Sequence, residues 1–105
     1  MAGKRAPEGL SKDAGAFWRH TVAEFDFEPH HERLLTLACE AWDRGRDAGG
    51  AVVRDGAFYV DRHGATRPHP GLAVQRDATM TFARLLRELD LDGEPGPDPR
   101  PPRRP

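Results

Sequence analysis

The stretch that decides the fold is Leu34-Leu35-Thr36-Leu37-Ala38-Cys39-Glu40-Ala41-Trp42-Asp43-Arg44, near the middle of the 105-residue chain. Placed at about 100° per residue, its apolar positions cover an arc of roughly 160° on a helix. We expect this helix to run from about Pro29 to Ala48 and to stop at Gly49-Gly50. The arc is wide for a helix that touches one neighbour, which favours self-association or a protein partner.

Two further helices are predicted on either side of this stretch. Upstream, Ser11 is a suitable N-cap for a helix over Lys12 to about Phe25, which Asp26-Phe27-Glu28-Pro29 then breaks. Downstream, Pro70 begins a third helix that ends before Asp92-Gly93. Its apolar residues recur at helical spacing, and they are Val74, Ala78, Phe82, Leu85, Leu86 and Leu89.

A β-hairpin is predicted between the second and third helices. Val52-Val53 and residues 57–60 are short β-prone runs on either side of Arg54-Asp55-Gly56, whose Asp-Gly pair is a turn signal. His63-Gly64 supplies a second turn before Arg67-Pro68-His69-Pro70. The predicted fold class is mainly α: a helical hairpin, a short β-hairpin, a third long helix and a disordered proline-rich C-terminal tail.

Length and composition predict one small domain with two loose ends. We expect residues 1–9 to form a loose N-terminal arm, residues 10–91 a single helical domain, and residues 92–105, rich in proline and arginine, a disordered tail. No run approaches the ~20 apolar residues of a membrane span, and no apolar signal segment follows the first residues. These features, with the single Cys39, predict a cytoplasmic protein without disulfides.

Because basic and acidic residues are nearly equal in number, any nucleic-acid binding must depend on local clusters of basic side chains. Sixteen basic residues face seventeen acidic ones, for a formal net charge of -1, so the chain is no polycationic coat. The first candidates for DNA contact lie near the N-terminus and on the hairpin: Lys4, Arg5, Lys12, Arg62 and Arg67. A second set of candidates lies with Met80 on one stripe of the third helix: Arg76, Arg84 and Arg87. The alternative interpretation is that this stripe is simply the solvent-exposed face of the helix.

Large apolar residues exceed what so short a chain covers easily, which makes six of them candidates for the core or an oligomer interface: Phe17, Trp18, Leu34, Trp42, Phe82 and Leu85. Catalytic patterns are missing from the sequence. It has no glycine-rich phosphate loop and no Gly-x-Ser-x-Gly elbow, and its histidines and Cys39 lack metal-ligand spacing. We therefore predict no enzyme activity, no metal and no cofactor.

Four segments in order resemble the small subunit of tailed-phage terminases. They are Leu10-Ser11-Lys12-Asp13-Ala14 followed by Phe17-Trp18, the Leu34–Arg44 helix, the hairpin leading to Arg67-Pro68-His69-Pro70, and Leu85-Leu86-Arg87-Glu88-Leu89-Asp90-Leu91. The sequence departs from the family at Gly71, where Ala often follows His-Pro, at Asp90, where Gly is common, and in its proline-rich tail. Gly71 is tolerated in a first helical turn.

The resemblance implies a non-enzymatic role in viral genome packaging. Such subunits assemble into homo-oligomeric rings, bind viral double-stranded DNA and regulate the large terminase subunit, and this work takes place in the host cytoplasm. Two alternatives remain open. One is a small helix-turn-helix DNA-binding regulator, although the second helix, as its recognition helix, would present leucines and acidic residues. The other is a helical protein-interaction adaptor that binds no nucleic acid.

Overall fold

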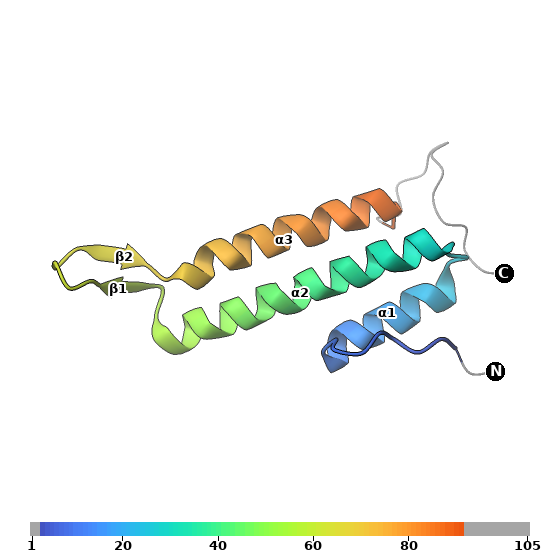
Figure 1. Ribbon diagram of the computed structural model, residues 1–105, viewed down its shortest axis with the longest axis horizontal. Helices are drawn as coiled ribbons and strands as arrows, with labels where there is room; N and C mark the ends of the chain where they lie inside the picture. The colour runs from blue at the N-terminus through green and yellow to red at the C-terminus, as the bar shows by residue number, and fades with distance from the viewer. Residues whose placement is uncertain (1–2, 92–105) are drawn as a thin grey trace.

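The computed structural model describes residues 3–91, which form three helices and a two-stranded antiparallel sheet (Figure 1). The chain order is α1 (Lys12–Glu24), α2 (Pro29–Asp55), β1 (Phe58–Val60), β2 (Thr66–Pro68) and α3 (Pro70–Leu89). Helices α2 and α3 run antiparallel, α1 packs beside the N-terminal half of α2, and the β-hairpin projects beyond the far end of the α2–α3 pair. The predicted mainly α fold class is confirmed.

The helix starts follow local capping chemistry. Ser11 is the N-cap of α1, since its hydroxyl accepts a hydrogen bond from the Ala14 N–H at 3.1 Å. Pro29 occupies the first turn of α2, and Pro70 does the same in α3. His69 precedes Pro70 and caps α3 through Nδ1, so all three predicted starts are confirmed.

The predicted end of α2 at Gly49-Gly50 is wrong, because the helix continues to Asp55. Glycine at this place allows a close approach of α3. A Cβ built on Gly49 would lie 2.8 Å from Gln75 Nε2, and one built on Gly45 would lie 3.3 Å from the Ala78 Cβ. The helix ends instead at Gly56, whose φ of 91° is open to glycine but strained for other residues.

The predicted first strand at Val52-Val53 is also wrong, since these residues form the last turn of α2. The hairpin pairs β1 with β2 in the register Phe58 to Pro68. Its turn lies at the second predicted position, where Asp61 accepts hydrogen bonds from the His63 and Ala65 N–H groups and Gly64 has a φ of 83°. Val52 is helical instead of extended because α3 packs beside this end of α2, and its side chains provide the contacts that stabilise the last turn of the helix.

The core lies where α1, α2 and the end of α3 meet. Its buried residues are Ala14, Trp18, Val22, Leu35, Cys39 and Leu89. The Trp18 indole N–H donates to Thr36 Oγ1 at 3.1 Å, so its one polar group is satisfied. Helix α2 has both α1 and α3 as neighbours, and these two helices cover most of its wide apolar arc, while Leu37 within the arc stays 52% exposed.

The two ends of the chain differ in what the structure describes. Residues 3–9 form neither helix nor strand, yet Ala6 packs against the core and Lys4 Nζ pairs with Glu32 at 2.5 Å. The predicted disordered tail, residues 92–105, lies outside the described residues.

Candidate DNA-binding and assembly surfaces

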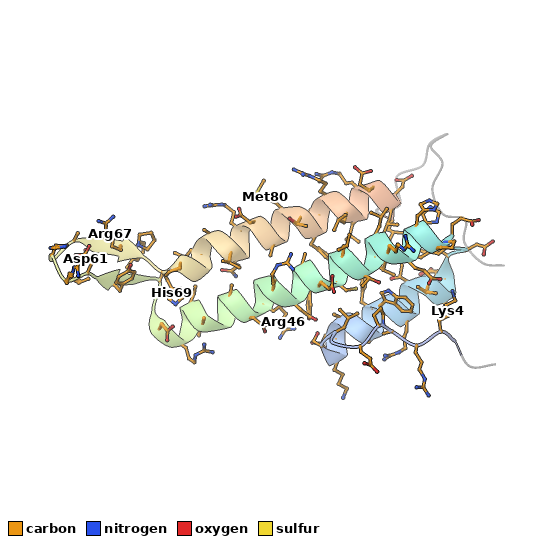
Figure 2. All side chains as sticks on the ribbon, viewed as in Figure 1. Lys4, Arg46, Asp61, Arg67, His69 and Met80 are labelled. Atoms are coloured by element: carbon orange, nitrogen blue, oxygen red, sulfur yellow. The ribbon has the colours of Figure 1, made fainter. Side chains whose placement is uncertain are left out.

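The first set of DNA-contact candidates does not form one patch. Lys4 lies at the three-helix end, whereas Arg67 lies on the β-hairpin at the opposite end of the longest axis, which measures 60 Å (Figure 2). Arg5 lies with Lys4, since both line one hollow beside Glu32, whereas Lys12 begins α1 and lines a separate hollow beside Asp43 and Asp47. Arg62 belongs with Arg67 on the hairpin. A single DNA duplex would therefore meet these cations at separate places.

The cations on the hairpin are partly engaged within the turn. Arg67 Nε donates to Asp61 Oδ2 at 3.0 Å, and Arg62 Nε donates to His63 Nε2 at 3.3 Å. The hydrogen bond from Arg67, followed by those from the Ala65 and His63 N–H groups, lowers the pKa of Asp61 below its ordinary value. Arg67 therefore stabilises the turn, which reduces its freedom to reach a phosphate.

The second set lies on one rigid element. Arg76, Arg84 and Arg87 are exposed on α3, and Met80, in the same stripe, projects from the side of α3 away from α2 (Figure 2). At about 1.5 Å of rise per residue, the three arginines span about 16 Å, enough to follow several phosphates of one strand. Within residues 3–91, Arg84 and Arg87 make no ion pair, and Arg76 lies 3.8 Å from Asp77.

Sequence reasoning missed one further cation, Arg33. It lines an open hollow of about 750 Å³ together with Arg5 of the N-terminal segment, Trp18 and the exposed Leu37. In the sequence Arg33 is one of several charged residues on α2. Its proximity to Arg5 depends on the path of residues 3–9 across the helices, which no local pattern indicates.

Three of the six apolar candidates meet in a second hollow, which we call the three-helix groove. It has a volume of about 420 Å³ and is lined by Asp13, Ala14, Phe17, Cys39, Trp42 and Phe82. The Phe17 and Phe82 rings lie 6.2 Å apart between centroids, and Phe17 remains 38% exposed. Arg46 covers part of the groove's edge, since its guanidinium lies 4.8 Å from the Trp42 ring.

The other three apolar candidates have different surroundings. Trp18 belongs to the core, Leu34 packs against it, and Leu85 is half-buried on α3. Of the six, only Phe17 counts as exposed in the monomer. Beyond these candidates, three consecutive exposed apolar residues form β1 of the hairpin, and single ones lie on α2 and α3: Leu37, Val53, Val74 and Met80.

The His31 side chain has a structural role at the start of α2. His31 Nδ1 accepts from the Glu28 N–H at 2.9 Å at the start of α2, and burial, then the neighbouring His30, lower its pKa. Within residues 3–91 no three His, Cys, Asp or Glu side chains gather as metal ligands would. The same residues contain no helix that is long and apolar enough to cross a membrane.

The position of α2 bears on the helix-turn-helix alternative. A recognition helix must present one open face to a DNA groove. Here α2 is flanked by α1 and α3, and its described acidic residues include Glu40 and Asp47 on exposed positions. The helix in the second position is therefore poorly placed to read DNA, while the outer face of α3 is open.

The fold and these surfaces define a small, mainly helical protein with an exposed arginine stripe and an open apolar groove. The family model described as phage terminase, small subunit, matches residues 14–94, which include nearly all of the three helices and the whole hairpin. The chain belongs to this family.

Two other comparisons add little to the family assignment. The chain is 45% identical over 64 residues to a methionyl-tRNA formyltransferase of Rhizorhabdus wittichii strain RW1. That match covers 58% of this chain but only 20% of the relative, so the chain spans about a fifth of that protein's length. No solved structure matches the chain.

Proposed function

We propose that this protein acts in viral genome packaging as a homo-oligomeric ring that binds viral double-stranded DNA and regulates the large terminase subunit in the host cytoplasm. The observation that carries the proposal is the family match over residues 14–94. The protein is proposed to act without catalysis of its own, as a recognition and regulatory subunit.

The arginine stripe of α3 is the proposed DNA-contact surface. Arg84 and Arg87 make no ion pair within the described residues, and a helix holds them at fixed spacing. In contrast, Lys4 and Arg67 of the first set are already paired with carboxylates. A ring would repeat a short stripe in every subunit, so many weak phosphate contacts could act together on a chain of net charge -1.

The test measures DNA binding by fluorescence anisotropy as salt rises from about 50 to about 200 mM. We expect steep weakening, because each neutralised phosphate contributes a slope of about 0.9 in log affinity against log salt. An Arg84→Gln, Arg87→Gln double variant should weaken binding and lower the slope. The comparison variant, Arg62→Gln with Arg67→Gln, should do so less at a protein concentration where light scattering shows that it keeps the wild-type oligomeric mass.

Three results would redirect the proposal. Equal loss in both double variants assigns contacts to the hairpin as well. Loss only when Lys4, Arg5 and Lys12 are neutralised assigns them to the three-helix end. No binding at low salt supports the adaptor alternative and removes the DNA-binding part of the proposal.

Regulation of the large subunit is tested with the purified pair. The protein alone should hydrolyse neither ATP nor DNA, and its addition should change both activities of a cognate large subunit. Turnover by the protein alone that survives chelator and purification controls contradicts the non-catalytic assignment. Unchanged large-subunit activity over a wide range of added protein contradicts the regulatory one.

A further inference from the structure

The β-hairpin arm, residues 57–69, carries apolar side chains into solvent. Phe58 is 63% exposed, Tyr59 49% and Val60 68%, although these residues form the whole of β1. A two-stranded sheet is marginally stable in water unless something packs against it. An exposed apolar strand on such an arm is typical of a surface that another molecule covers.

The three-helix groove is an apolar acceptor of suitable size elsewhere on the same chain. Its volume of about 420 Å³ accommodates aromatic side chains, and its lining includes the Phe17 and Phe82 rings, which are tilted by 53° relative to each other. A further hollow, between α2 and α3, adjoins the three-helix groove, because Trp42 and Phe82 line both. The groove therefore extends along the helix pair instead of ending as an isolated pit.

The arm cannot reach the groove of its own chain. Trp42 lies 13 positions before Asp55, the end of α2, which is about 20 Å of helix. The arm leaves that end pointing away from the three-helix region (Figure 1). The two surfaces can therefore meet only between different copies of the chain.

Charge also favours this pairing. Within the arm, Arg62 and Arg67 outnumber Asp61. Beside the groove, at the start of α1, a polar hollow is lined by three aspartates and two cations, namely Asp13, Asp43, Asp47, Lys12 and Arg46. An arm with one excess positive charge would thus enter next to a rim with one excess negative charge.

We propose that the β-hairpin arm of one copy docks into the three-helix groove of the next copy. The inference rests on the proposed self-assembly and names the surfaces that perform it. Because the donor and acceptor surfaces differ, the contact is head-to-tail, and such a contact forms a ring when the rotation between successive copies closes on itself. In such an assembly, the groove of each subunit covers the arm of one neighbour, and the arm of each subunit fills the groove of the other neighbour.

The first experiment removes the apolar arm surface. In a Phe58→Ser, Val60→Ser variant, light scattering should show the mass falling from the wild-type oligomer to the 11.7 kDa monomer. The matched control is Leu37→Ser, which changes a 52% exposed apolar residue outside both surfaces and should keep the oligomer. Circular dichroism should show the same helix content in all three proteins, because none of the replaced side chains is buried.

The second experiment captures the contact between copies. A Val60→Cys protein, changed on the same face of β1 as Phe58, is mixed with a Phe17→Cys protein of different tagged length, and mild oxidation should link the two. Leu37→Cys in place of Phe17→Cys should give no such link. The native thiol of Cys39 is buried beneath the groove, which keeps its background reaction low.

The outcomes separate this inference from the proposed function. An oligomer that persists in the arm variant, with no cross-link from Val60→Cys to Phe17→Cys, overturns arm docking and leaves ring assembly standing by another surface. A monomeric wild-type protein overturns both. If the arm variant keeps its oligomeric mass but no longer affects the large subunit, the arm binds that subunit and the inference is wrong.

Discussion

Replacing Gly50 by alanine is expected to stabilise the protein, because Gly50 lies inside α2 and has no described heavy atom within 4 Å of the position an added Cβ would take. Gly50 does not have a positive φ. Among the glycines of the described residues, those with a positive φ are Gly9, Gly56 and Gly64. Alanine therefore fits the helical backbone without strain. Glycine in a helix interior costs about 0.5 to 1 kcal/mol relative to alanine, so the gain should have this size.

Urea unfolding followed by circular dichroism measures the change. The free energy of unfolding should rise by about 0.5 to 1 kcal/mol, and the thermal midpoint by several degrees for a domain of this size. Wild type and variant must be compared at one protein concentration, because self-association adds to apparent stability. The slope against urea should stay unchanged, since the same surface is buried in both.

Gly56→Ala is the matched control, because Gly56 has a φ of 91° at the end of α2. With a ψ of 146°, this backbone conformation is open essentially to glycine alone, so alanine there should destabilise the protein by about 1 to 3 kcal/mol. The opposite pattern, with Gly50→Ala destabilising and Gly56→Ala neutral, would mean that the chain turns at Gly49-Gly50. Such a result would contradict a helix that continues to Asp55.

Three further outcomes are expected from single side chains. His69→Ala should lower the free energy of unfolding by about 1 kcal/mol, because Nδ1 accepts the Gly71 N–H at 2.8 Å, and His69→Asn should restore part of it in the same urea assay. The pKa of Asp61 is lowered in the fold, so its stabilisation of the turn is present above pH 3.8 and disappears as pH falls through the lowered pKa; amide NMR signals of the turn should show this, and Asp61→Asn should not. Burial, with Asp43 and Glu40, raises the pKa of Cys39 from 9.0 to about 11, so stability should fall between these pH values, and a Cys39→Ala variant should lack that fall.

The sequence by itself determined the helix starts and the family. Ser11, Pro29 and Pro70 act on backbone groups within a few residues, so their effect can be read without knowledge of distant contacts. The periodicity of the apolar residues likewise determined three helices with buried faces. The short motifs around them identified the terminase small subunit family, which the match over residues 14–94 confirms.

Only the tertiary structure decided where α2 ends and which side chains share a surface. Glycine can stop a helix or admit a neighbouring helix, and at Gly45 and Gly49 the outcome depends on the packing of α3, whose Ala78 and Gln75 lie beside them and are distant in sequence. In the same way, the ion pair of Lys4 with Glu32 depends on residues that the chain path brings together from afar. Local patterns record a residue's own preference, whereas packing between distant segments determines which of its permitted states has the lowest free energy.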